Sequence, residues 1–159
     1  MLKYLPTSAL TPDQVGHMAH TDVGSLTLLF TSSPGLEVLS RTTSTWIPLT
    51  PPSGTVAVNV GDTLRYLSSG VLESCLHRVV PQVSQETGLS TTRYSLAFFH
   101  RPELDAEFMD AQGNLWTGEQ WHKTKYRIFR ASNHEQMQNS LLTGRVGFLG
   151  EANTDIDNS

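Results

Sequence analysis

Short apolar runs separated by turn residues fill the stretch between residues 25 and 100. The clearest, Thr55–Val60, alternates valine with small or polar residues, a period of two that predicts a strand with one buried face. We predict strands at Ser25–Thr31, Gly35–Leu39, Thr55–Val60, Thr63–Leu67, Ser74–Val80 and Arg93–His100. Pro48, Pro51 and Pro52 confine the segment around Trp46 to a sheet edge or a loop. Strands at this spacing, with no helical pattern between them, predict a sandwich or barrel.

The last third of the chain has helical features instead. Thr117 followed by Gln120 resembles a capping box, and Trp121 to Phe129 can form an amphipathic helix. A second short helix is predicted near His134–Leu142, with Gly144 to end it. We therefore expect a β core over residues 1–105, a helical extension over 106–150 and a disordered polar tail over 151–159.

The composition excludes several kinds of function. Of the 159 residues, 38% are hydrophobic and 16% charged, which is typical of one folded domain. A net charge of −4, with scattered Lys and Arg, argues against binding to nucleic acid or to a membrane surface. No stretch approaches the roughly 18 apolar residues of a membrane span, and the first residues lack the pattern of a secretory signal. The single cysteine, Cys75, suits a reducing compartment, so we expect a soluble, cytoplasmic protein.

His20-Thr21-Asp22 and the distant His77 are candidate metal ligands. In an extended segment residues i and i+2 point to the same face, so His20 and Asp22 can hold one metal ion from adjacent positions. His77, from another strand, completes one face of an octahedron and leaves the opposite positions open. Two histidines and one carboxylate in this arrangement suit Fe(II) enzymes that bind O₂ and a co-substrate together. By itself an H-x-D triplet is more often a turn or surface feature, and a lone histidine more often structural.

Arg93 and Ser95 are candidates for binding a carboxylate. They share one face of a predicted strand, so a guanidinium and a hydroxyl can converge on a single anionic group. Charge-assisted hydrogen bonds from arginine are the strong way to hold such a group away from water. Without a metal site nearby, a surface arginine would be the simpler interpretation.

Five segments in order resemble the isopenicillin N synthase-like branch of the Fe(II)/2-oxoglutarate-dependent oxygenases. The segment from Gly16 to Phe30 resembles that family's G-x-H-x-D-x-G-x-L-T-x-L motif. The other four are Gly35-Leu36-Glu37-Val38, Val58-Asn59-Val60-Gly61-Asp62, Ser74-Cys75-Leu76-His77-Arg78-Val79-Val80 and Arg93-Tyr94-Ser95. The segment Trp121–Arg127 also looks like fungal members of the branch.

The resemblance implies a mainly β fold, with a double-stranded β-helix (jelly-roll) core followed by C-terminal helices. It assigns His20, Asp22 and His77 to Fe(II), and Arg93 and Ser95 to the distal carboxylate of 2-oxoglutarate. The implied activity is a dioxygenase reaction: with O₂, the keto acid gives succinate and CO₂, while a small organic molecule is hydroxylated, desaturated or cyclised. A role in specialised metabolism is expected, and Arg78 is expected to be structural.

One departure from the family pattern leaves alternatives open. Relatives usually carry a substantial region before the first strand, and this chain begins close to the metal motif. We therefore expect a jelly roll that is incomplete at its N-terminus, with an exposed sheet edge that favours self-association or a completing chain. The alternatives are a non-catalytic metal-binding remnant, a half-enzyme that needs a partner, and a related iron oxidase that does not use 2-oxoglutarate.

Overall fold

The protein is described from a computed structural model in which two compact units are distinguished. The structure describes residues 2–4, 17–31, 33–80, 82–84, 86, 89–90 and 92–139. The first unit comprises Met1–Ala19, Leu28–Val58 and His77–Phe98, and the second comprises His20–Thr27, Asn59–Leu76 and Phe99–Ser159. The predicted tail at 151–159, Gly144 and the end of the second predicted helix lie outside the described residues.

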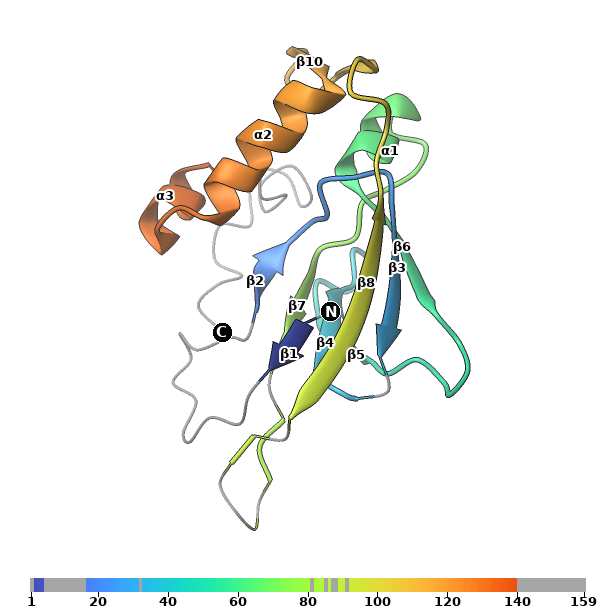
Figure 1. Cartoon of the computed structure of the whole chain (residues 1–159), viewed down its shortest axis with the longest axis vertical. Helices are drawn as coiled ribbons and strands as arrows, with labels where there is room; N and C mark the ends of the chain where they lie inside the picture. The colour runs from blue at the N-terminus through green and yellow to red at the C-terminus, as the bar shows by residue number, and fades with distance from the viewer. Residues whose placement is uncertain are drawn as a thin grey trace. The chain divides into compact units, whose positions relative to one another are not determined.

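The chain forms two four-stranded sheets, and most of their residues belong to the first unit. One has the order β1 (Leu2–Tyr4), β8 (Arg93–His100), β3 (Leu26–Thr31), β6 (Ala57–Val60), and the other β2 (His17–His20), β7 (His77–Val79), β4 (Leu36–Leu39), β5 (Trp46–Leu49). β8 is the long strand between β1 and β3 in Figure 1. It pairs with β1 in antiparallel register, and β4 pairs in the same way with both β5 and β7. The mainly β prediction is confirmed.

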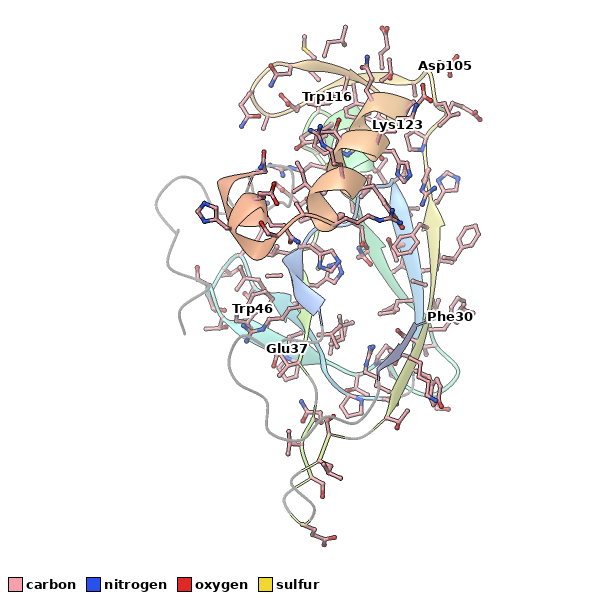
Figure 2. All side chains as sticks on the ribbon, turned by 60° about the vertical axis from the view of Figure 1, so that its left-hand side comes forward. Phe30, Glu37, Trp46, Asp105, Trp116 and Lys123 are labelled. Carbon is pink, nitrogen blue, oxygen red and sulfur yellow. The ribbon has the colours of Figure 1, made fainter. Side chains whose placement is uncertain are left out.

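The proline-rich segment around Trp46 forms the edge strand β5, as predicted. Pro48 lies within β5, opposite Glu37 of β4. Because β5 ends its sheet, the missing N–H of proline disrupts no ladder on the outer side. Arg78 of β7 donates to Glu37 over 2.8 Å, and its guanidinium lies 4.1 Å from the centre of the Trp46 ring; Figure 2 labels both partners. Arg78 thus connects the strand that begins with His77 to its neighbours.

The predicted strand at Thr63–Leu67 is wrong, because these residues belong to a helix, α1 (Asp62–Leu67). A segment this short does not reveal its period, so apolar residues at Leu64 and Leu67 fit a helix as well as a strand. The helix begins after Gly61 and places Asp62 in its first turn, where the helix dipole stabilises negative charge. It also turns Thr63 inward, where its hydroxyl lies 3.2 Å from that of Ser25.

The C-terminal helices lie in the second unit. In α2 (Gly118–Phe129) the predicted capping box is confirmed: the Gln120 N–H donates to Thr117 Oγ1, and the Thr117 N–H donates to Gln120 Oε1. α3 (Asn133–Gln138) begins with a second capping box, between Ser132 and Glu135. Among the described residues, no helix is both long and apolar enough to cross a membrane.

A hairpin that the sequence did not predict precedes α2. Its strands β9 (Glu107–Met109) and β10 (Leu115–Thr117) pair in antiparallel register. Around them four aromatic rings pack with centroids 5.3 to 5.9 Å apart, from Tyr66, Phe108, Trp116 and Trp121. Trp121 is completely buried, so this cluster is the apolar core of the second unit.

Asp110 organises the turn of this hairpin, and its replacement by asparagine is expected to destabilise the fold. One carboxylate oxygen accepts from the backbone N–H groups of Gln112 and Asn114, and the other accepts from Trp116 Nε1 at 2.8 Å. An asparagine has an NH₂ group in place of one carboxylate oxygen, and this group cannot accept a hydrogen bond from the N–H donors on that side. We expect a loss of about 1–3 kcal/mol in the free energy of unfolding, measured with urea at pH 7. The exposed Asp105, labelled in Figure 2, provides the control Asp105→Asn.

The same variant should show a defined pH dependence. Burial acts to raise the pKa of Asp110, but the hydrogen bonds from Asn114, Trp116 and Gln112 outweigh it and hold the pKa below 3.8. A carboxyl whose pKa is lower in the folded than in the unfolded state stabilises fully above its unfolded pKa and loses this contribution as the pH falls through the folded pKa. The stability difference between wild type and Asp110→Asn should therefore narrow below about pH 3.8. A difference that is constant with pH would contradict this role.

Candidate metal and co-substrate site

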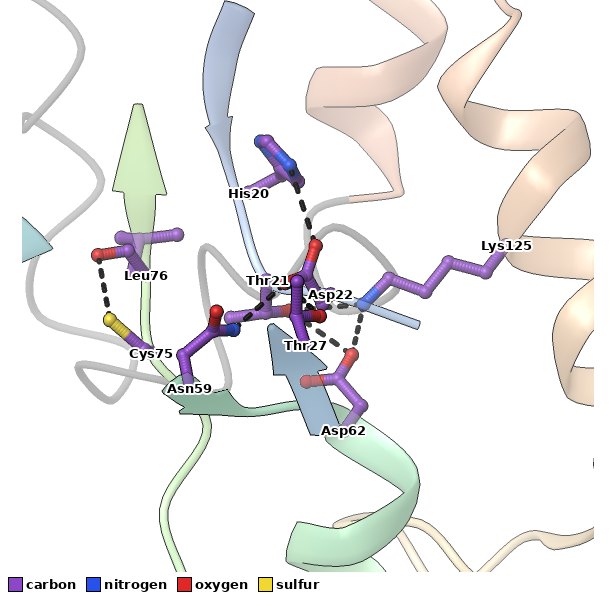
Figure 3. A network of polar contacts seen from close by, with 9 residues as sticks. All are labelled: His20, Thr21, Asp22, Thr27, Asn59, Asp62, Cys75, Leu76 and Lys125. Atoms are coloured by element: carbon purple, nitrogen blue, oxygen red, sulfur yellow. Dashed lines mark hydrogen bonds and ion pairs between the residues drawn. The ribbon is translucent and has the colours of Figure 1, made fainter. Parts of the chain in front are cut away.

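The Asp22 carboxylate has one oxygen fixed by hydrogen bonds and the other directed toward His20. Asp22 Oδ2 accepts from Thr27 Oγ1 at 2.6 Å and from Asn59 Nδ2 at 2.8 Å. Asp22 Oδ1 lies 3.9 Å from His20 Nε2, and a dashed line marks this contact in Figure 3. Ligands on adjacent octahedral positions about 2.1 Å from an ion are about 3 Å apart, so these two atoms would move somewhat closer together on binding one metal ion.

His77 is the third residue that the sequence predicts as a metal ligand. It is the first residue of β7 and directly follows Leu76, which is only 2% exposed. The donor atoms of His20, Asp22 and His77 lie within 4.8 Å of one another. Two imidazoles and a carboxylate with one oxygen already engaged match the donor set of a two-histidine, one-carboxylate Fe(II) centre.

The loop that carries Asp22 is fixed by backbone hydrogen bonds to the start of α1. The Gly61, Asp62 and Thr63 N–H groups donate to the carbonyl oxygens of Ser25, Asp22 and Gly24 over 2.9, 2.8 and 3.1 Å. The approach is so close that a Cβ on Gly61 would lie 2.2 Å from the Gly24 oxygen. Only glycine fits at position 61, which gives a steric reason for the Asn59-Val60-Gly61-Asp62 sequence.

A buried polar network lies on the other side of the same loop. Thr21, Asp62 and Lys125 are each 0–1% exposed. Lys125 Nζ donates to Thr21 Oγ1 at 3.0 Å and also to Asp62 Oδ2, while the Thr21 hydroxyl donates to Asp62 Oδ2 at 3.1 Å. Burial lowers the pKa of Lys125, and the adjacent Asp62 carboxylate opposes this shift.

No sequence motif indicates this network. Lys125 stands four residues after Trp121 and four before Phe129, on the apolar face of its helix. A lysine at such a position is a signal of a buried partner, because lysine is almost never fully buried unless paired. Asp62 accepts a hydrogen bond from Thr21, and Asn59 donates one to Asp22, so both stabilise this loop.

Arg93 and Ser95 lie on the buried face of β8. Each is 4% exposed, whereas the alternate residues Tyr94 and Leu96 are 49% and 51% exposed. Alternate residues of this strand are therefore buried and exposed, as expected. The buried residues are polar and the exposed ones apolar, the reverse of an ordinary strand at a protein surface. Arg93 Nε donates to the Pro34 carbonyl over 3.2 Å, which helps fix the guanidinium. A cation and a hydroxyl buried on one face are suited to binding an anionic group.

Comparison with known proteins defines the class of this chain. The model of the 2OG-Fe(II) oxygenase superfamily matches residues 1–102. The chain belongs to the 2OG-Fe(II) oxygenase superfamily. The 2-oxoglutarate-dependent dioxygenase gloE of Glarea lozoyensis is 46% identical over 90% of this chain and 42% of its own length. The 2-oxoglutarate-dependent dioxygenase iboH of Amanita muscaria is 44% identical over 81% of this chain and 63% of its own.

Solved structures agree with this assignment. Full-length Neurospora crassa T7H in complex with alpha-KG and thymine superposes with a TM-score of 0.61 and 33% identity, over 84% of this chain and 37% of that one. A 2OG-Fe(II) oxygenase family protein from Caulobacter crescentus gives 0.63 and 30% over 80% of this chain and 44% of its own. The chain thus spans 37% to 63% of the length of these four relatives.

These findings confirm the family resemblance and the jelly-roll fold, and with them Fe(II) and 2-oxoglutarate as the cofactors of the family. The narrower resemblance to the isopenicillin N synthase-like branch stays a prediction. So do the domain boundary at residue 105 and the individual roles of the site residues.

Proposed function

We propose that this chain is an Fe(II)- and 2-oxoglutarate-dependent oxygenase that oxidises a small organic molecule. The observation that carries the proposal is the convergence of the His20, Asp22 and His77 donor atoms within 4.8 Å in a member of this superfamily. In the overall reaction one atom of O₂ enters succinate as 2-oxoglutarate loses CO₂. In a hydroxylation, the other atom enters the substrate. Bound Fe(II) supplies the centre at which O₂ and the keto acid react.

The proposed roles of the protein residues follow from their surroundings. His20, Asp22 and His77 hold the metal ion through neutral imidazoles and a carboxylate. Thr27 and Asn59 donate to Asp22 Oδ2, and Oδ1 lies 3.9 Å from His20 Nε2, so Oδ1 is the proposed metal ligand. Hydrogen bonds to a ligating carboxylate keep its orientation and its affinity for metal.

Arg93 and Ser95 bind the distal carboxylate of 2-oxoglutarate in this proposal. Both side chains are buried on the same face of β8, where charge-assisted hydrogen bonds are little weakened by water. The related oxidases that use no 2-oxoglutarate could place a substrate carboxylate at the same pair. Stoichiometric release of succinate separates the two functions.

Arg93→Ala is expected to bind Fe(II) as the wild type does and to bind 2-oxoglutarate at least about 30-fold more weakly. Removing one partner of a buried, hydrogen-bonded charge pair costs about 2–5 kcal/mol, and 2 kcal/mol corresponds to about 30-fold. The measurement is anaerobic titration of the Fe(II) protein with 2-oxoglutarate, followed by the visible absorption of the chelate. The exposed Arg127 provides the control Arg127→Ala. Equal affinity in Arg93→Ala and wild type would remove Arg93 from the site.

We further propose a small organic substrate, in keeping with the thymine complex of the Neurospora relative. Hydroxylation, desaturation and cyclisation are all within this chemistry. The test is O₂ uptake coupled to succinate formation when candidate small molecules are added to the Fe(II) and 2-oxoglutarate complex. Metal binding with no 2-oxoglutarate-dependent O₂ uptake would favour the alternative of a metal-binding protein without turnover.

The cytoplasmic location stays a prediction.

We also propose that the chain associates with itself. Apolar side chains on the neighbouring strands β8, β3 and β6 are strongly exposed: Phe98 59%, Phe30 46% and Val58 58%. Exposed apolar side chains on neighbouring strands favour association. We expect a concentration-dependent sedimentation coefficient that Phe98→Lys lowers to the monomer value; a monomeric wild type would contradict it.

A further inference from the structure

One face of α2 contacts three positions in the segment that carries two of the proposed metal ligands, His20 and Asp22. Trp121 Nε1 donates to the Val23 carbonyl over 3.2 Å, and Lys125 Nζ donates to Thr21 Oγ1 over 3.0 Å. The third contact is the Phe129 ring, which meets the His20 ring edge-on, with centroids 5.5 Å apart and an interplanar angle of 84°.

The spacing of these contacts indicates a continuous interface. Trp121, Lys125 and Phe129 are four residues apart, so they form one stripe along the helix. The contacts follow in antiparallel order: Trp121 contacts Val23, Lys125 contacts Thr21 and Phe129 contacts His20. The helix lies at residues 118–129, outside the 1–102 match to the family model.

Thr21 is the point at which the helix can act on both ligands at once. It stands between His20 and Asp22, and its hydroxyl accepts from Lys125 while it donates to Asp62. A hydroxyl with both a donor and an acceptor in place has a fixed rotamer, and the backbone that carries it is fixed as well. Figure 3 shows Lys125 reaching this loop from α2, with Asp62 beside Thr21.

An apolar contact would suffice if the helix only covered the loop. Replacing a buried ion pair by well-packed apolar residues is often neutral or stabilising, so the Lys125–Asp62 pair is not explained by stability alone. What the charged pair adds is direction, because its hydrogen bonds specify where the Thr21 side chain lies.

We propose that α2 is a positioning element for the metal centre and that Lys125 is its positioning residue, acting through Thr21 on His20 and Asp22. This inference rests on the proposed function, since it takes these two residues as metal ligands. Its consequence is that the affinity for the metal depends on a hydrogen bond from a helix that lies outside the matched family domain.

The test is titration of the full chain with Co(II) alone, with the affinity and the visible ligand-field spectrum as readouts. Thr21→Val keeps the branched shape and leaves the Lys125–Asp62 pair intact, but removes the hydroxyl that connects it to the loop. We expect a 10- to 100-fold loss of Co(II) affinity, the usual effect of losing a hydrogen bond around a ligand shell, and an altered spectrum. Thr21→Ser retains the hydroxyl, so its affinity for Co(II) is expected to stay within about threefold of the wild-type value. That change is smaller than the 10-fold minimum expected when a hydrogen bond around the ligands is lost.

A second variant tests the same inference from the helix. Lys125→Met with Asp62→Leu removes both charges together and avoids leaving one of them buried without a partner. It should fold, as circular dichroism would verify, and should bind Co(II) as weakly as Thr21→Val. The exposed Lys123, on the same helix, provides the control Lys123→Met, which should bind normally.

The outcomes are distinguishable. A folded Thr21→Val protein that binds Co(II) as tightly as Thr21→Ser, with the same spectrum, would overturn the inference and leave the proposed function standing. A wild-type chain that binds no Co(II) would overturn the proposed function and this inference together.

Discussion

Replacement of His77 by alanine is expected to reduce the affinity for Fe(II) by at least about 100-fold. Loss of a single hydrogen-bond partner around a metal ligand already costs 10- to 100-fold, so loss of the ligand itself belongs at or beyond the upper end. His77 is at the first position of β7, and its donor atom lies within 4.8 Å of those of His20 and Asp22. The measurement is an anaerobic competition titration of purified protein with Fe(II).

His100→Ala is the matched control for this experiment. His100 is the last residue of β8 and its side chain is exposed, so its removal should leave the iron affinity unchanged. Circular dichroism should show both variants folded, which separates loss of a ligand from loss of structure. If His77→Ala bound Fe(II) as tightly as His100→Ala, the assignment of the three ligands would be wrong.

Lys125→Met is expected to have the largest effect on stability, a loss of about 3–5 kcal/mol in the free energy of unfolding. The variant leaves the Asp62 carboxylate, 1% exposed, without the cation that pairs with it. Desolvating a charge without a partner is what makes the breaking of a buried pair costly. Since small domains are stable by only about 5–15 kcal/mol, this change removes a substantial part of the total.

Two further variants establish that the cost comes from the unpaired charge. Lys125→Met combined with Asp62→Leu should recover most of the lost stability, because neither charge then remains buried. Lys123→Met, two residues away, breaks an exposed i,i+4 pair with Glu119 and should leave the stability almost unchanged, because water screens an exposed pair. Urea denaturation at neutral pH measures all three. A Lys125→Met variant no less stable than Lys123→Met would contradict the buried pair.

Two pairs of residues in the proposed site follow short-range rules, which is why the sequence could indicate them. His20 and Asp22 are two residues apart, and so are Arg93 and Ser95. Arg93 and Ser95 are both buried because alternate residues of a strand lie on the same face. The capping box that starts α2 is likewise a local pattern, with both hydrogen bonds present.

What the sequence did not predict depends on contacts between distant segments. The helix α1 looks like a strand because six residues are too few to show a period, and its inward residue Thr63 finds its partner at Ser25, 38 positions away. The role of Lys125 depends on Asp62 and Thr21, 63 and 104 positions away. Neither pairing can be read from the neighbours of these residues along the chain.

The hairpin β9–β10 escaped prediction for a different reason. Its strands have three residues each, which is too few to show an alternation of apolar and polar residues. Its turn is stabilised by the Asp110 side chain, which accepts hydrogen bonds from backbone N–H groups. Gly113, with φ +81, and Asn114 are the local turn signals that could have indicated it.

The central claim is that this chain assembles an iron site which binds 2-oxoglutarate. The most direct test is anaerobic titration of the purified wild-type protein with Fe(II) and 2-oxoglutarate, watching for the weak visible charge-transfer band of the chelate. We predict a saturable band that requires both additions and is lost in His77→Ala and in Arg93→Ala, but not in His100→Ala. A well-folded wild-type protein that gives no band would contradict the claim.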